Sequence, residues 1–142
     1  MTAQDVFKEL LQSTVAPALG AHGLKGSGQV FELPDERFWA LLGFQKSTYS
    51  DRSKVKFTIN LCVVSKAEYG EARRESSYLP AKPSPNIQGG PGWWQRIGYL
   101  LPERRDYWWT IGERDPIHQV AEQVLQAITE FGLPALRAQM GS

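Results

Sequence analysis

The sequence contains a single cysteine, Cys62, and only two histidines, His22 and His118, among its 142 residues. One thiol cannot form an internal disulfide, and this cysteine usage is typical of a reducing cytoplasm. A conventional structural zinc site needs about four ligands, mostly Cys and His, and three widely spaced residues do not supply them. We therefore expect no cofactor and no metal site of that kind, while a metal held by carboxylates alone stays open.

Long apolar runs and an excess of one charge are also missing. No run approaches the ~20 apolar residues that span a bilayer, and residues 1–11 mix acidic and amide side chains into their apolar pattern, unlike a secretory signal. The formal net charge is +1, so no overall field steers the chain to nucleic acid or to an anionic membrane. These features predict a cytoplasmic protein without membrane contact.

Motifs of the common catalytic and nucleotide-binding sites are absent. The sequence has no Gly-x-Ser-x-Gly elbow, no Walker loop and no dinucleotide fingerprint. The Gly-rich stretch 89–92 lacks the lysine and the following helix that would hold a phosphate. Nothing near Cys62 in its strand would activate the thiol, and His22 and His118 fit solvent-exposed positions at helix ends. We therefore predict no catalytic residue and favour a protein that is not an enzyme.

Apolar residues at steps of three and four predict one helix near each end of the chain. The first runs from Ala3 to Leu19, with Thr2 as its N-cap and with Gly20 and Gly23 at its exit. The last begins near Asp115, which would cap it, and ends at Gly132, where Pro134 would enforce a break. A short turn over 133–140 and a short helix over 66–74 complete the helical prediction.

Alternating apolar and polar residues predict an antiparallel sheet of about five strands. The strands are expected at 29–33, 37–46, 55–64, 96–100 and 107–111, with a flexible turn or bulge at 26–28. The fold class is therefore α+β, with the N-terminal and C-terminal helices packed on one face of the sheet. Residues 1–142 form one domain, in which Gly141-Ser142 is typical of a cloning remnant.

The clearest strand, 55–64, indicates what each face of the sheet carries. Val55, Phe57, Ile59, Leu61 and Val63 point to one face, while Thr58, Asn60 and Cys62 share the other with Lys56. One face is thus covered by the helices, and the second is predicted to be polar or open.

Aromatic and polar side chains gather on this second face. Trp39, Gln45, Thr58, Asn60 and Arg96 are expected there, with one tryptophan from each of the pairs Trp93-Trp94 and Trp108-Trp109. Such a mixture can bind a partner or ligand through stacking, cation–π contacts and hydrogen bonds. The alternative stays open that tryptophan and arginine simply cover the sheet.

Several short motifs follow one another in a recognisable order along nearly the whole chain. They are Gly23-Leu24-Lys25, Gln45-Lys46-Ser47, Phe57-Thr58-Ile59-Asn60-Leu61, Arg96-Ile97-Gly98, Trp108-Trp109 and Gly132-Leu133-Pro134. In this order they resemble the bacterial family named domain of unknown function 4304. The resemblance implies the helix–sheet–helix outline and a cytoplasmic location, and it implies no activity, cofactor or catalytic residue.

Three functional hypotheses follow. The first is a non-enzymatic bacterial binding or interaction protein, of which toxin immunity is one form, that uses the aromatic–Arg face. The second is a small-molecule-binding protein or enzyme in which the Pro/Gly-rich loop 76–92 acts as a lid over Gln45, Asn60 and Arg96. Nucleic-acid binding ranks last, because the aromatic stretch 93–114 holds nearly as many acidic as basic residues.

Overall fold

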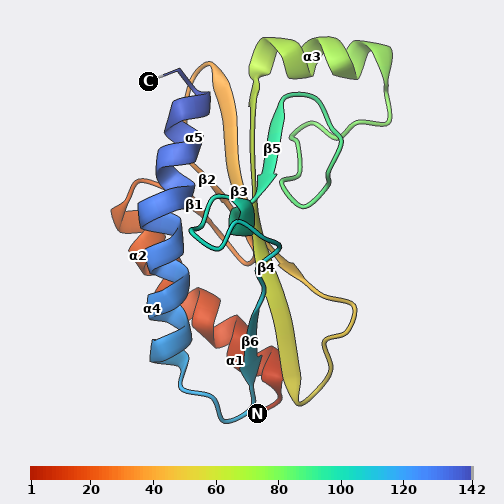
Figure 1. Cartoon of the computed structure of the whole chain (residues 1–142). Coiled ribbons are helices and arrows are strands. Elements are labelled where there is room, and N and C mark those ends of the chain that lie inside the picture. Colours follow the sequence, from red (N-terminus) through yellow and green to blue (C-terminus); the bar gives the residue numbers. More distant parts are fainter. Residues whose placement is uncertain (142) are drawn as a thin grey trace.

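The computed structural model describes residues 1–141, so Ser142 of the expected remnant lies outside the described residues. Within them the fold is α+β, as predicted, and Figure 1 shows its outline. The helices are α1 (Ala3–Glu9), α2 (Ala16–Ala21), α3 (Lys66–Glu75), α4 (Ile117–Ala127) and α5 (Leu133–Gln139). The strands are β1 (Lys25–Ser27), β2 (Val30–Glu32), β3 (Phe38–Lys46), β4 (Lys54–Ser65), β5 (Trp93–Arg96) and β6 (Trp109–Gly112).

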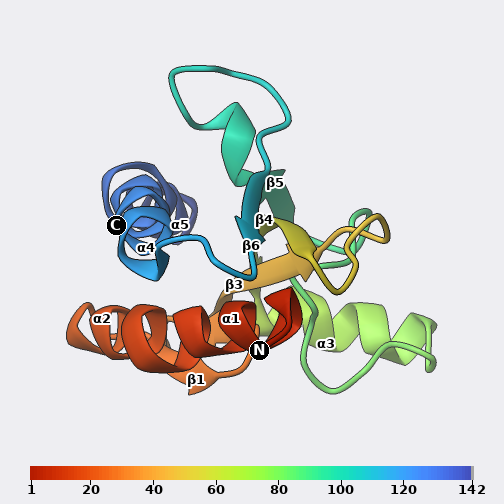
Figure 2. The same ribbon diagram turned by 90° about the horizontal axis from the view of Figure 1, so that it is seen from below.

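The strands form one antiparallel sheet in the order β1-β2-β3-β4-β5, and β6 also pairs with β4. Because β3 occupies one edge of β4, β5 and β6 share the other edge, at Asn60–Val63 and Lys54–Phe57 respectively. The chain from Ile97 to Trp108 connects these two strands and projects from the sheet (Figure 2). Thr58 of β4 lies between the residues that pair with β5 and those that pair with β6, opposite this connecting segment.

The core lies between one face of the sheet and the terminal helices. Every apolar residue predicted for that face of β4 is buried, as are Ala40, Leu42 and Phe44 of β3. They pack with Phe7 and Leu10 of the first helix and with apolar residues of the last helix, such as Val124 and Ile128. The prediction that the N-terminal and C-terminal helices pack on one face of the sheet is therefore confirmed.

Three strand predictions need correction. Of residues 26–28, expected to form a flexible turn or bulge, the first two belong to β1, which pairs with β2 through Gly26. A Cβ atom at position 26 would lie 2.4 Å from the Val30 carbonyl oxygen. This point of the strand therefore requires glycine, the residue that the pattern attributed to a turn. The strand expected at 96–100 is wrong: β5 ends at Arg96, and Ile97–Tyr99 is a 3₁₀ turn. The last strand begins at Trp109 rather than at 107.

The predicted break at Gly132 and Pro134 is also wrong, because the last helix continues. A π-helical segment, Ile128–Gly132, joins α4 to α5, and Pro134 lies in the first turn of α5. The first helix repeats this arrangement, with a π segment at Leu10–Val15 followed by Pro17. Proline cannot donate the usual helical hydrogen bond, and the wider π turn lets the helix pass through it.

The two helix starts differ from one another. Thr2 caps α1 as predicted: its hydroxyl accepts from the Asp5 amide, and the Asp5 carboxylate accepts from the Thr2 amide. Asp115 does not cap α4. Its carboxylate accepts from the Gly112 amide at 2.6 Å, so it closes the turn that leaves β6. Among residues 1–141, no helix is long and apolar enough to cross a membrane.

Candidate functional site

The second face of the sheet was predicted to be polar or open; it carries polar residues, and it is partly covered. The loop 76–92 and α3 lie on the side of the sheet away from α4 and α5 (Figure 1). Thr58 and Asn60 are both fully buried. These two predicted binding residues therefore support the structure beneath the surface and are not exposed to a partner.

Gly43 allows the loop to approach the sheet. A Cβ atom at this position would lie 2.6 Å from Asn86 Oδ1 and 2.7 Å from Pro85 Cγ. No other residue leaves that space empty, so the loop sits in a notch that β3 provides. The loop lacks periodic structure, yet it packs at a defined place.

Other contacts hold the loop along its length. Tyr69 of α3 donates its hydroxyl hydrogen to the Pro80 carbonyl at 2.8 Å, and Lys82 pairs with Glu32 at 2.6 Å. Trp94 donates its indole N–H to the Pro85 carbonyl at 2.7 Å. The loop therefore lies over this face as part of the fold.

A polar network connects the loop to three strands. Asn60 donates to Gln45 at 2.7 Å and to Asn86 at 3.0 Å, while it accepts from Arg96 Nε at 3.1 Å. Arg96 also donates to Gln45 at 3.3 Å. The predicted pocket over Gln45, Asn60 and Arg96 is thus filled by direct hydrogen bonds among these residues. No buried side-chain polar atom within the described part of the chain lacks a partner.

Thr58 has a separate role. Its hydroxyl donates to the Tyr107 carbonyl at 2.8 Å. Because Thr58 lies between the sites where β5 and β6 pair with β4, this bond attaches the connecting segment to the middle of the sheet. It fixes the backbone just before the tryptophan pair.

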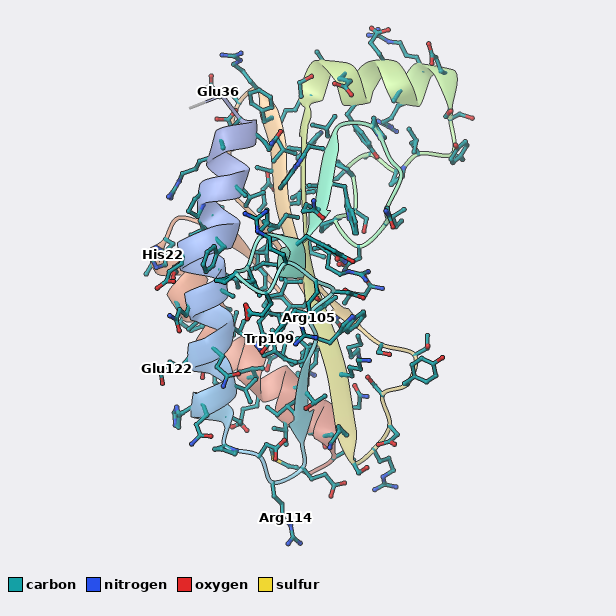
Figure 3. The ribbon with its side chains drawn as sticks, in the orientation of Figure 1. His22, Glu36, Arg105, Trp109, Arg114 and Glu122 are labelled. Carbon is teal, nitrogen blue, oxygen red and sulfur yellow. The ribbon has the colours of Figure 1, made fainter. Side chains whose placement is uncertain are left out.

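Trp108 and Trp109 point to opposite faces, as the alternation predicts. Trp109 pairs with Phe57 across the strands, and directly paired side chains share a face. Trp109 is consequently only 6% exposed and stacks on Phe57 with 5.9 Å between ring centroids. Figure 3 shows it between the sheet and α4. Trp109 is therefore the member of this pair that enters the core.

Trp93 and Trp94 divide in the same way. Trp93 pairs with Val63 and packs against the core, whereas Trp94 pairs with Cys62 and Arg96 with Asn60 on the second face. The sequence could not choose between the members of this pair without the register. The register brings Trp94, Arg96 and Trp108 together.

Four half-buried side chains alternate cation and ring on this face. Lys56 Nζ lies 5.4 Å from the Trp108 ring centroid, and Arg96 Cζ lies 5.1 Å from Trp108 and 5.7 Å from Trp94. We call Lys56, Trp108, Arg96 and Trp94 the cation–π ladder. Asp106 stabilises it by accepting a hydrogen bond from Arg96 Nη1 at 3.2 Å.

Trp39 is half-buried and lies apart from the ladder. Its ring contacts two lysines, Lys66 at 4.7 Å and Lys82 at 5.3 Å. Lys66 also donates to the Asp35 carbonyl at 2.7 Å. Trp39 therefore joins α3 and the loop to β3, at the end of the face distant from Trp108.

Cys62 is buried beneath the loop. Burial raises the pKa of its thiol to about 12, so the thiolate that would act as a nucleophile does not form near neutral pH. A cavity of about 70 Å³ lies beside it, lined by apolar residues such as Leu79 and Trp93. Throughout residues 1–141, no group of three or more His, Cys, Asp or Glu residues could hold a metal ion.

Comparison with known families agrees with the resemblance of the motifs. The family described as "Domain of unknown function (DUF4304)" matches residues 15–138. The chain belongs to this family. No curated protein and no solved structure matches the chain.

The DUF4304 match extends from the π segment of the first helix to α5. It therefore includes the whole sheet, the loop over its second face and all four residues of the ladder. Trp94 is the member of its pair that joins this face. Asn86, Asp106 and Lys56 complete the site, although they were not among the predicted binding residues. Lys56 could have been found from its face of β4, whereas Asn86 lies in a loop without periodicity.

Proposed function

We propose that this protein is a non-enzymatic binding protein whose partner is another protein that docks on the cation–π ladder. The observation that carries the proposal is the ladder itself, in which two indoles and two cations are half-buried and already ordered. Tryptophan and arginine are the residues that most often dominate protein interfaces. Their fixed geometry reduces the entropy that a partner must overcome.

The surroundings of the ladder support an interaction surface. The hydrogen-bonding groups of Asn60 and Gln45 are engaged beneath it, so the residues left at the surface are rings and cations. Lys56 and Arg96 give the surface a positive character, and Asp106 on Arg96 offsets part of it. A partner that presents carboxylates and flat apolar groups fits this chemistry.

We also propose a bacterial, cytoplasmic setting. The single buried thiol suits a reducing compartment, and the motif resemblance is to a bacterial family. Neutralising a partner protein, as toxin immunity proteins do, is one form of the proposed function.

Affinity capture with matched variants tests the proposal. Tagged wild-type protein, Trp108→Ala and Tyr49→Ala would be used to recover partners from a lysate of the native host. Tyr49 is an 86% exposed aromatic residue outside the ladder, so it controls for the loss of any surface ring. We expect one stoichiometric protein with wild type and Tyr49→Ala, and its loss with Trp108→Ala. Retention of that protein by folded Trp108→Ala, or no stoichiometric protein in any growth condition, would overturn the proposal.

A further inference from the structure

A second concave surface lies on the helical side of the sheet. It is a groove of about 270 Å³. One side is formed by the connecting segment from Leu101 onward and by Trp109 of β6, and the other by the helix that runs from α4 into its π segment. Because Trp108 and Trp109 point to opposite faces, this groove and the cation–π ladder lie on opposite sides of the sheet. An inference about the groove therefore does not depend on the proposed function.

Three aromatic rings line the groove, from Tyr107, Trp109 and Phe131. Tyr107 packs edge-on against Trp109 at 5.0 Å, and Trp109 stacks on the buried Phe57. The Tyr107 backbone is itself held by the hydrogen bond from Thr58. These contacts fix the Tyr107 and Trp109 rings before any ligand arrives, which lowers the cost of binding to them.

The charged groups that line the groove are all acidic. Glu103 lies on the connecting segment and Glu130 on the π segment, and the lining contains no lysine or arginine. Gln126 adds an amide and donates to Glu130 at 3.3 Å. Aromatic rings beside carboxylates are complementary to an organic cation, since the ring face and the carboxylate both attract positive charge.

One of these rings, Tyr107, already has a guanidinium group over it. Arg105, which does not line the groove, lies with its Cζ atom 5.4 Å from the Tyr107 ring centroid. A planar guanidinium stacks on a ring and donates to carboxylates at the same time, which an ammonium group does less well. The volume of the groove is below the usual range for drug-sized ligands and suits one long side chain.

We propose that this groove binds an arginine side chain presented by a partner protein. The guanidinium stacks against Tyr107, contacts the part of Trp109 that lines the groove, and donates to Glu103 and Glu130. The open rim, where Gln123 and Gln126 are exposed, lies beside the partner's backbone. The ligand class is therefore an exposed arginine in an extended segment.

NMR titration of the full-length protein tests this site. The probe is N-acetyl-Gly-Arg-Gly-amide, and the matched control peptide carries citrulline, which has the shape of arginine without its charge. We expect saturable shifts of the Trp109 indole and Phe131 ring signals with a Kd of roughly 1 mM. The citrulline peptide should not shift them, and high salt should weaken the arginine peptide's binding.

Variants of the two carboxylates test whether the arginine peptide binds in the groove. Glu103→Gln and Glu130→Gln should each weaken binding roughly three- to fivefold, and the double variant roughly tenfold. Glu122→Gln is the control, because Glu122 lies on the outer side of α4 and does not line the groove (Figure 3). Trp108→Ala should leave the titration unchanged.

Four outcomes would overturn the proposal. They are equal shifts with the citrulline peptide, equal weakening by Glu122→Gln and Glu130→Gln, no saturation up to roughly 50 mM peptide, or binding of spermidine without binding of the arginine peptide. The last outcome would identify the groove as a site for a free polyamine instead.

Discussion

Adjacent tryptophans in this chain have different physical roles. Trp109 fills the core against Phe57, whereas Trp108 lies half-buried on the second face between Lys56 and Arg96. The difference comes from the alternation of side chains along a strand and from the register of β6 on β4. Residue type alone therefore does not identify the surface residue of the pair.

Alanine substitutions should separate these roles. Trp109→Ala leaves a large cavity and should lower the free energy of unfolding by about 3–5 kcal/mol. Trp108→Ala removes two cation–π contacts at a partly exposed site and should cost less than about 1–2 kcal/mol. Urea unfolding of the two variants measures both values. Equal losses of stability would show that the assignment of faces is wrong.

The thiol of Cys62 should be unreactive in the folded protein. Burial raises its pKa from 9.0 to about 12, so the fraction of thiolate at pH 8.5 is far smaller than in the unfolded chain. Because the unfolded chain releases this proton first, the thiol's contribution to stability falls as the pH rises from 9 toward 12. Labelling with a disulfide reagent at pH 8.5 should be slow in buffer and rapid in denaturant, and rapid labelling in buffer would contradict the burial of Cys62.

At the scale of elements, the loop 76–92 determines what the second face of the sheet presents. Its Pro85 and Asn86 fill the notch at Gly43, and Asn86 joins the network around Asn60. A segment rich in proline and glycine has no period that predicts such contacts. The second hypothesis did place this loop over Gln45, Asn60 and Arg96, but the contacts that fix it there and the full burial of Thr58 and Asn60 were not predicted.

Two glycine substitutions test the packing of this loop. Gly43→Ala places a methyl group against Pro85 and Asn86 and should lower stability by about 1–3 kcal/mol. Gly70→Ala is the matched control, because Gly70 lies in α3 with no atom within 4 Å of an added Cβ; it should raise stability by about 0.5–1 kcal/mol. Hydrogen exchange of residues 80–90 should increase only in Gly43→Ala. Unchanged exchange there would contradict the role of the notch.

The elements with strong periodicity could be predicted, and those governed by distant contacts could not. The long strand β4 and its partner β3 were found from alternation, because one face is continuously apolar. The helices were found for the same reason. The first helix was predicted to run past Pro17, and it does. Its π segment and the passage of the last helix through Pro134 were not predicted, since a π segment depends on packing against the sheet as well as on local sequence.

For the whole molecule, the sheet separates two surfaces of different chemistry. The cation–π ladder lies on one face beside the loop, and the acidic aromatic groove lies on the other beside α4. The connecting segment 97–108 contributes to both. Gly98 allows its tight path, because a Cβ atom there would lie 2.1 Å from the Arg105 carbonyl oxygen.

The candidate site was only partly predictable from the sequence. Alternation placed Gln45, Asn60 and Arg96 together, and their hydrogen bonds confirm that they meet. Alternation could not say which tryptophan of each pair joins them, because that depends on the register of β5 and β6 with β4. It also could not show that Gln45, Asn60 and Arg96 hydrogen-bond to one another beneath the surface.

Isothermal titration of the captured partner into purified wild type, Trp108→Ala and Tyr49→Ala tests the role of the ladder most directly. A residue at the centre of a protein interface typically contributes enough that its loss raises Kd roughly 30-fold or more. We predict that increase for Trp108→Ala and a change of less than roughly threefold for Tyr49→Ala. Wild-type affinity in a folded Trp108→Ala protein would contradict the assignment of this face as the binding surface.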